Sequence, residues 1–281
     1  MSLISKAIFR CFAAEISCCM RSSVQSVFMN EKLSRRKLIT TGLATAAGLS
    51  GLAVATRLAV KYGLIPPDWR GLYGAGTTLT YAAQRVLTRH SLAREFPKSM
   101  ISKAPFANGK PPKANAFKKL EAGGFADWRL QVDGIVAHPG SFSLSDLRSL
   151  PVRNQITQVT CEEGWCYIAE WIGTPLSHVL EAVGIQSLAK FIVYYSMEEG
   201  WWDSIDMADA LHPQTFLTYG FNGGDLPVGF GGPLRIRIPR QLGYKSVKYI
   251  NKLTITDDIR KFGKGQGSAA SEYGYCWYAG M

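Results

Sequence analysis

The chain has 281 residues, of which 47% are hydrophobic and 11% aromatic, so it can bury a core of ordinary domain size. Its net charge of +11 comes from the N-terminal part: residues 1–119 carry nineteen Lys and Arg against four Asp and Glu, whereas residues 120–281 carry thirteen against seventeen. The folded part therefore lacks the basic composition typical of nucleic-acid binding, and a nucleic acid is not an expected partner.

Residues 1–60 are predicted to be an extension followed by a twin-arginine signal, a helical leader ahead of the folded part. Arg35 and Arg36 precede eighteen uncharged residues, 38–55, most of which are Ala, Gly and Thr. This pattern predicts export to the periplasm by the twin-arginine route, which carries folded proteins, often with a cofactor already bound. The same length could cross a bilayer, so the segment could instead be retained as an N-terminal membrane anchor.

Residues 61–119 are predicted to hold a helix and a linker. Apolar residues such as Leu79 and Val86 recur at helical spacing and predict a helix over residues 76–96. Several prolines and a glycine interrupt residues 97–115, which predicts an extended linker. The remaining boundaries are 120–262 for the folded domain and 263–281 for a glycine-rich C-terminal tail.

The folded domain is predicted to be α+β. Helices are expected from a cap at Thr174 to Gly184, and over residues 206–211. Asp133-Gly134 is typical of a hairpin turn. Strands outnumber helices and do not alternate with them, which argues against a doubly wound sheet. The expected strands, rich in β-branched and aromatic residues or alternating in polarity, are 128–132, 156–160, 189–196, 234–238 and 247–256.

Cys161 is the first candidate functional residue. Outside the leader only Cys161, Cys166 and Cys276 occur, an odd number that argues against a disulfide scaffold. Cys161 follows a predicted strand and precedes a loop containing Gly164, a position where reactive groups are often held. A thiolate there could bind a redox metal or act as a nucleophile. The alternatives are an inert buried cysteine or a local disulfide with Cys166.

A second candidate site lies in two glycine-containing segments, 231–240 and 243–248. Glycine lets backbone amides approach an anion, and Arg235, Lys245 and Lys248 could add charged hydrogen bonds to a phosphate. The alternative is a strand with a solvated basic edge.

In their order along the chain, these segments resemble the molybdopterin-binding domain of the sulfite-oxidase family. The resemblance implies an α+β fold built on a mixed sheet, with a molybdenum-molybdopterin cofactor. The tail residues 275–280 also look like tails of bacterial members. The matching pieces are 128–136, 161–165, 169–173, 207–213, 231–235 and 243–248.

The resemblance also implies roles for individual residues. Cys161 matches the thiolate that binds molybdenum, and Glu163 matches an acidic residue beside the metal in bacterial methionine-sulfoxide-reductase relatives. Both are therefore the candidate catalytic residues, with Cys161 also the metal ligand. The implied cofactor-binding residues are Ser196, Arg235, Ser246, Val247 and Lys248.

Two departures from the family pattern stand out. Phe230 occupies the place of a His or Asn that hydrogen-bonds the cofactor in relatives. The upstream pterin-contacting segment is represented only by residues 105–109 (Pro-Phe-Ala-Asn-Gly). The loss of one polar contact keeps open an alternative, a non-catalytic scaffold that binds the cofactor.

The family implies a periplasmic oxidoreductase that carries out two-electron oxygen-atom transfer on a sulfur-oxide substrate. The expected substrate is a small-molecule S-oxide or a methionine S-oxide in a protein, and sulfite oxidation is the alternative. The sequence has no Cys-x-x-Cys-His haem motif. A separate electron-transfer partner is therefore expected, with a membrane haem subunit or a cytochrome as the candidates.

Overall fold

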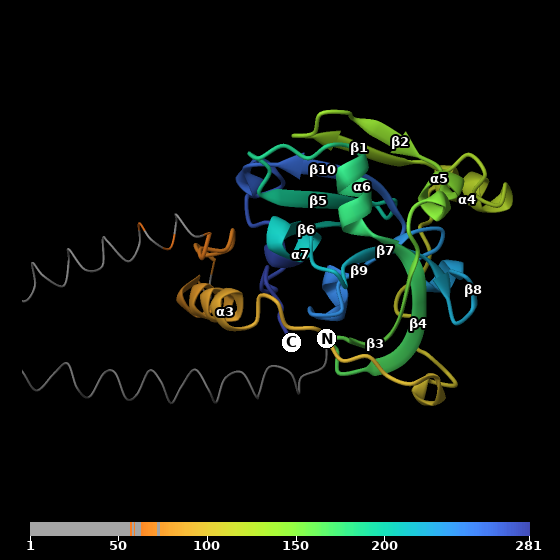
Figure 1. Ribbon diagram of the computed structural model, residues 1–281, viewed down its shortest axis with the longest axis horizontal. Coiled ribbons are helices and arrows are strands. Elements are labelled where there is room, and N and C mark those ends of the chain that lie inside the picture. The colour runs from red at the N-terminus through yellow and green to blue at the C-terminus, as the bar shows by residue number, and fades with distance from the viewer. Residues whose placement is uncertain (1–56, 58, 60–62, 72–73) are drawn as a thin grey trace, which may run out of the picture. The chain divides into compact units, whose positions relative to one another are not determined.

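A computed structural model describes residues 57, 59, 63–71 and 74–281 (Figure 1). The twin-arginine motif and the uncharged stretch after it lie outside the described residues, so the leader remains a prediction. Within the described part of the chain, no helix is both long enough and apolar enough to cross a bilayer.

A mixed five-stranded sheet forms one layer of the fold. Strand β1 runs parallel to β10, and the other neighbours in this sheet are antiparallel. This arrangement confirms the predicted α+β class with a mixed sheet. In spatial order the strands are β2 (Gly140–Phe142), β1 (Leu130–Gly134), β10 (Ile250–Thr256), β5 (Phe191–Ser196) and β6 (Trp202–Asp206).

A second sheet is antiparallel throughout and includes the long curved strand β4 (Figure 1). Strands β3 and β4 form a hairpin in register from Arg153 opposite Gly173 to Thr160 opposite Cys166. Cys161 is therefore the first residue of the loop at the hairpin's tip. The strands are β3 (Arg153–Thr160), β4 (Cys166–Pro175), β7 (Phe216–Phe221), β8 (Gly224–Asp225) and β9 (Arg235–Arg237), which pairs with β7.

The helices are short, and side chains mark the starts of some of them. Ser143 and Asp146 cap each other's backbone amides at the start of α5, and Asp206 caps α7, where a short helix was predicted. The α-helices are α3 (Gly74–Leu87), α4 (Asn115–Ala122), α5 (Leu144–Ser149), α6 (Leu176–Ala182), α7 (Met207–Ala210) and α8 (Ala269–Glu272). Single 3-10 turns cover Lys98–Met100, Val228–Phe230, Gly243–Lys245 and Ile259–Lys261.

One apolar core joins both sheets to helix α6. It includes fully buried side chains from α6, β1, β5, β7, β9 and β10. A smaller, mostly aromatic cluster packs under β4 and β7, with Trp171 against Phe221 at 5.0 Å between ring centroids. Because the larger core links the two sheets, the loops that leave β3 and β9 are held in fixed relative positions.

Helix α3 ends at Leu87, nine residues earlier than predicted. Beyond it the chain extends along the edge of β3: Glu95 forms a bridge with Thr157, and the Phe96 amide donates to the Ile156 carbonyl. Pairing with an open strand edge thus overrides helical periodicity in residues 93–96.

Two further local predictions are wrong for identifiable reasons. Gly134 continues β1 beside β10 instead of forming a hairpin turn, and a Cβ on it would lie 2.0 Å from the Ile255 carbonyl oxygen. Thr174 does not cap a helix, because β4 extends to Pro175 and the Thr174 hydroxyl donates to the Pro151 carbonyl. In both cases tertiary pairing replaces the local turn or cap that the sequence predicts.

Candidate active site

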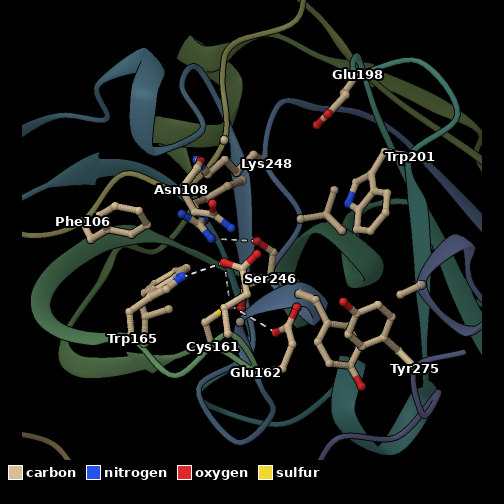
Figure 2. Close-up of a pocket in the computed structure, with 18 of the residues that line it drawn as sticks. Phe106, Asn108, Cys161, Glu162, Trp165, Glu198, Trp201, Ser246, Lys248 and Tyr275 are labelled. Atoms are coloured by element: carbon tan, nitrogen blue, oxygen red, sulfur yellow. Dashed lines mark hydrogen bonds between the residues drawn. The ribbon is translucent and has the colours of Figure 1, made fainter. Parts of the chain in front are cut away.

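A cavity of about 300 Å³ opens between the tip of the β3–β4 hairpin and the loops that surround β9 (Figure 2). The side chains that line it come from segments far apart in the sequence. The upstream segment contributes Phe106 and Asn108, and the β5–β6 turn contributes Glu198 and Trp201. Cys161 lies in its wall.

The backbone holds Cys161 in a tight loop. Its amide donates to the Trp165 carbonyl at 3.0 Å, and its carbonyl accepts from the Gly164 amide at 3.1 Å. Gly164 has a φ of +91°, which favours glycine. On the other side, a Cβ on Gly243 would approach the Thr160 carbonyl to 3.3 Å. A glycine at position 243 therefore lets the second loop pack closely against the cysteine.

Two carboxylates lie beside the Cys161 thiol, which is only 6% exposed. Its Sγ is 3.2 Å from Glu162 Oε2 and 3.9 Å from Glu163 Oε2, and Glu163 accepts a hydrogen bond from the Trp165 indole at 2.8 Å. Burial, assisted by both carboxylates, raises the pKa of Cys161 to about 12. A free thiol here is therefore protonated at neutral pH, and only a bound cation would make it a thiolate.

Arg235 and Lys248 bring two cations to the wall of the cavity. Gly231 separates them: a Cβ on it would lie 2.9 Å from the Lys248 side chain and 3.2 Å from Arg235 Cβ. Arg235 donates to the carbonyls of Phe230 and Ser246, and Lys248 donates to those of Asn108 and Gly229.

These cations fit an anionic ligand. No carboxylate of the described residues forms an ion pair with Arg235 or Lys248. The buried Nε of Arg235 also has no hydrogen-bond partner in this part of the chain. Burial, and then the charge of Arg235, lowers the pKa of Lys248 to about 8. An anion in the cavity would stabilise both charged forms, as the phosphate of a pterin cofactor would.

Ser246 and Val247 also line the cavity. The Ser246 carbonyl accepts from Arg235, and its hydroxyl accepts from Arg237 and from the Ile238 amide, both at 3.2 Å. Arg237 is fully buried, so the predicted alternative of a solvated basic edge on this strand is wrong. The two arginines instead fix the loop that carries the predicted cofactor-binding residues.

Lys245 does not face the cavity. It is fully buried and paired with the buried Asp203 of β6, and it also donates to the Ser204 carbonyl at 2.7 Å. The suggestion that Lys245 could contact a phosphate is therefore wrong, because Asp203 already neutralises its charge. Its role is to anchor the 243–248 loop to the mixed sheet.

Ser196 and Phe230 lie outside the set of residues that form the cavity wall. Ser196 ends β5, and its hydroxyl accepts a hydrogen bond from the Glu198 amide at 2.9 Å. Glu198 lines the cavity, whereas Ser196 does not. Phe230 stacks on Phe221 with 4.4 Å between centroids and packs edge-on against Tyr167. The aromatic ring thus replaces a polar cofactor contact with packing against the smaller core.

Several wall residues were not singled out from the sequence. Glu162 was named only as the neighbour of Glu163, and the upstream 105–109 segment was predicted as a whole, with no role for Phe106 or Asn108. Trp165 belonged to the cysteine motif without an assigned role. Tyr244 and Tyr275 lie in the 243–248 and 275–280 segments, but neither was assigned a role. Glu198 and Trp201 come from the β5–β6 turn and were not predicted to line the site.

We expect Lys248→Met to lower the cofactor content of the purified protein about tenfold, because one charge-assisted hydrogen bond to a phosphate contributes about 1.5–3 kcal/mol. Lys252→Met is the matched control, since Lys252 is a half-exposed lysine that pairs with Asp133 on the surface. Fluorescence of the released, oxidised pterin measures the content. Equal content in the two variants would contradict the assignment.

The fold and the cavity define a class of protein. A buried thiol flanked by carboxylates lines a cavity whose wall also holds two cations, as expected for a protein that binds an anionic, metal-carrying redox cofactor. The chain belongs to the oxidoreductase molybdopterin binding domain family, whose profile matches residues 118–261. The predicted sulfite-oxidase-type molybdopterin oxidoreductase family is thereby confirmed.

Named relatives fall within the same group. The chain is 36% identical to a candidate protein-methionine-sulfoxide reductase subunit, YedZ1 of Azospira oryzae, over 68% of this chain and 69% of that protein. It is 30% identical to the protein-methionine-sulfoxide reductase catalytic subunit MsrP of Ralstonia nicotianae over 46% of this chain and 44% of that protein. The chain thus spans less than half of this MsrP relative. The sulfane dehydrogenase SoxCD from Paracoccus pantotrophus is a structural neighbour at 24% identity and a TM-score of 0.46, over 47% of this chain and 39% of that one.

Proposed function

We propose that the protein reduces a neutral sulfur oxide by two-electron oxygen-atom transfer, with methionine S-oxide, free or in a protein, as the substrate type. The reaction R2S=O + 2e⁻ + 2H⁺ → R2S + H2O removes one oxygen and forms one water. The supporting observation is the charge of the cavity wall beside Cys161, where Glu162 and Glu163 lie next to the thiol and Glu198 stands across the opening (Figure 2).

The acidic wall argues against sulfite as the substrate. Sulfite is an anion, and each carboxylate within about 4 Å would repel it by about 1 kcal/mol in water and by about 4 kcal/mol near a protein surface. The two cations of the wall, Arg235 and Lys248, are the residues proposed to hold the cofactor phosphate, which would already compensate their charge. A neutral S-oxide meets no such repulsion.

The aromatic residues of the wall suit a thioether group. Phe106 packs on Trp165 at 5.1 Å between centroids, and Trp201 and Tyr275 face the same cavity (Figure 2). Sulfur and methyl groups bind favourably at aromatic edges. These side chains would hold the sulfur and methyl groups of the substrate near Cys161.

When bound, the cofactor supplies a molybdenum ion that exchanges electrons and oxygen with the substrate. Cys161 would be the protein's thiolate ligand, and Glu163, fixed by the Trp165 indole, would be the carboxylate beside it. Arg235 and Lys248 would hold the phosphate, while Ser246 and Val247 would pack against the pterin. Ser196 would act through the turn that carries Glu198.

The test is a comparison of both reactions on molybdenum-loaded protein. We expect reduction of methionine sulfoxide or dimethyl sulfoxide by reduced viologen to exceed oxidation of sulfite by ferricyanide by about 100-fold in kcat/KM, which corresponds to about 2.7 kcal/mol of discrimination. A kcat/KM for sulfite that equals or exceeds the S-oxide value would overturn the proposal.

The non-catalytic scaffold remains the second candidate because of Phe230, whose ring packs on Phe221 where relatives have a polar contact. The two functions differ in turnover. About one molybdenum per chain with turnover supports the enzyme. Folded protein that shows no turnover, with or without bound molybdenum, supports the scaffold.

We propose further that the protein works in the periplasm and exchanges electrons with a separate partner, a membrane haem subunit or a cytochrome. The support is the twin-arginine motif and the lack of a Cys-x-x-Cys-His sequence in the chain. The names of the reductase-subunit relatives agree with an enzyme made of more than one subunit.

Replacing both signal arginines, Arg35→Lys with Arg36→Lys, should trap the protein in the cytoplasm, since the twin-arginine route reads this pair. Cell fractionation followed by immunoblotting measures the location. Lys32→Arg, which changes a neighbouring basic residue conservatively, is the control. Normal periplasmic export of the double variant would contradict the leader assignment.

A further inference from the structure

Helix α3 buries its charged residue and exposes its large aliphatic residues, which is the reverse of a usual amphipathic helix. Its buried residues are Tyr81 and Arg85, the only charged residue in the helix. The Arg85 guanidinium pairs with Asp206 at 2.7 Å and Asp209 at 2.8 Å, and the Tyr81 hydroxyl donates to Asp206 at 2.6 Å. The helix is therefore docked on the domain through the ion pairs of Arg85 and the packing of Tyr81 against Trp277 and Tyr278, which leaves its aliphatic side chains outward.

The outward face of α3 is uncharged and carries large apolar side chains. Leu79 is 72% exposed, Val86 68% and Leu87 78%. At 100° per residue, these positions and the exposed Ala83 fall on one side of the helix, opposite Tyr81. A soluble helix would normally bury such a stripe, and a contiguous exposed one marks an interaction surface.

Basic and amphipathic residues flank this face at both ends. Trp69 and Arg70 precede the helix and are exposed, with the guanidinium 4.7 Å from the indole centroid. After the helix come Arg89, Leu92 and Arg94, all exposed. The only acidic residue of the described part of residues 63–94 is Asp68, which is buried and accepts from the Trp277 amide.

We infer that this face, comprising Leu79, Ala83, Val86 and Leu87 with the flanking Trp69, Arg70, Arg89 and Arg94, binds the surface of an anionic lipid bilayer. An interfacial helix buries apolar side chains at the headgroup boundary while adjacent arginines contact lipid phosphates. Tryptophan at the helix start suits the same boundary. Charge complementarity favours lipid over a neutral protein groove.

The helix length fits this mode of binding. Fourteen residues span about 21 Å along the axis, so α3 can lie in the membrane plane but cannot cross it. In Figure 1 the α3 ribbon lies at the margin of the fold, and its buried side docks at the Asp206 end of β6.

Vesicle flotation of the full-length protein tests the inference. We expect the wild type to float with vesicles of phosphatidylcholine and phosphatidylglycerol, and much less with phosphatidylcholine alone. The triple variant Leu79→Ser, Val86→Ser, Leu87→Ser should bind anionic vesicles at least about tenfold more weakly, because three exposed apolar contacts are lost. Leu79→Asp should weaken binding as well. The matched control is Val152→Ser with Leu188→Ser, at exposed apolar sites elsewhere.

The wild type, the variants and the control all keep the uncharged stretch 38–55, so any vesicle binding by that stretch is the same in all of them. All substituted positions are exposed, so the melting temperature should stay unchanged and weaker binding would report on the α3 face. If the triple variant binds anionic vesicles as the wild type does, the inference is overturned. It is equally overturned if vesicle binding is unaffected but the variant loses association with a membrane protein. Neither result bears on S-oxide turnover, which is measured with a soluble dye.

Discussion

Cys161→Ser should abolish S-oxide reduction, with a loss well beyond the factor of about 10–100 that is typical when only an outer-shell partner of a metal is removed. The proposed role of Cys161 is to complete the coordination of the molybdenum, and a serine hydroxyl is a harder, less electron-rich ligand. The protein should remain folded, because the loop is held by backbone hydrogen bonds of Cys161, Gly164 and Trp165 that serine preserves.

The variant should also retain part of its pterin. Arg235 and Lys248 are held by backbone carbonyls and make no hydrogen bond to the thiol. Dye-linked activity and released-pterin fluorescence are measured on the same sample. Cys166→Ser is the control, since Cys166 is an exposed free thiol five residues away and should behave like the wild type. Activity of Cys161→Ser near the wild-type value would end the ligand assignment.

Lys245→Met should be the most destabilising single change near the site, at about 3–5 kcal/mol, because it leaves the buried Asp203 carboxylate without its partner. Both side chains are fully buried, and the Lys245 carbonyl also accepts from the Tyr194 hydroxyl. Loss of this anchor should loosen the loop that carries Ser246 and Lys248. Urea unfolding measures the change in free energy.

The defect should grow as the pH rises. Burial raises the pKa of Asp203 to about 6, although Lys245 lowers it, so removing Lys245 raises it further. A carboxyl with a raised folded pKa contributes stability below its unfolded pKa of about 3.9 and loses it as the pH passes the folded value. The variant should therefore be closest to the wild type at about pH 5 and least stable at about pH 8.

The double variant Asp203→Asn with Lys245→Met isolates the charge effect. It has no ionisable group at this position, so it should recover part of the lost stability and show no added dependence on pH between about 5 and 8. Equal losses for Lys245→Met at both pH values would show that packing, not the unpaired carboxylate, is responsible.

Much of the fold was predictable because strand signals are local. Runs such as 156–160 and 189–196 lie within or overlap the observed β3 and β5, and the helix capped by Asp206 formed where expected. Strand β4 was not predicted, since it carries Glu170 and Gly173 among apolar residues and has no clear alternation. β4 nevertheless forms a regular strand, because it pairs with β3 along the whole length of β3.

The residues of the site could be predicted only where they belong to a motif of the family. Cys161, Arg235 and Lys248 were brought to one cavity as the family resemblance implied. Lys245 has the same charge and lies in the same loop, yet its partner Asp203 is 42 residues away, and no local pattern shows that pairing. The apolar spacing in α3 correctly predicted a helix, but the carboxylates that turn Arg85 inward come from residues 206 and 209.

The central claim, a molybdenum ion bound by Cys161, is tested most directly by molybdenum X-ray absorption on the loaded wild type and on Cys161→Ser. We expect the sulfur shell of the wild type to contain one sulfur atom more than that of the variant, with the pterin sulfurs present in both. Identical sulfur shells in two molybdenum-containing samples would show that Cys161 is not a ligand.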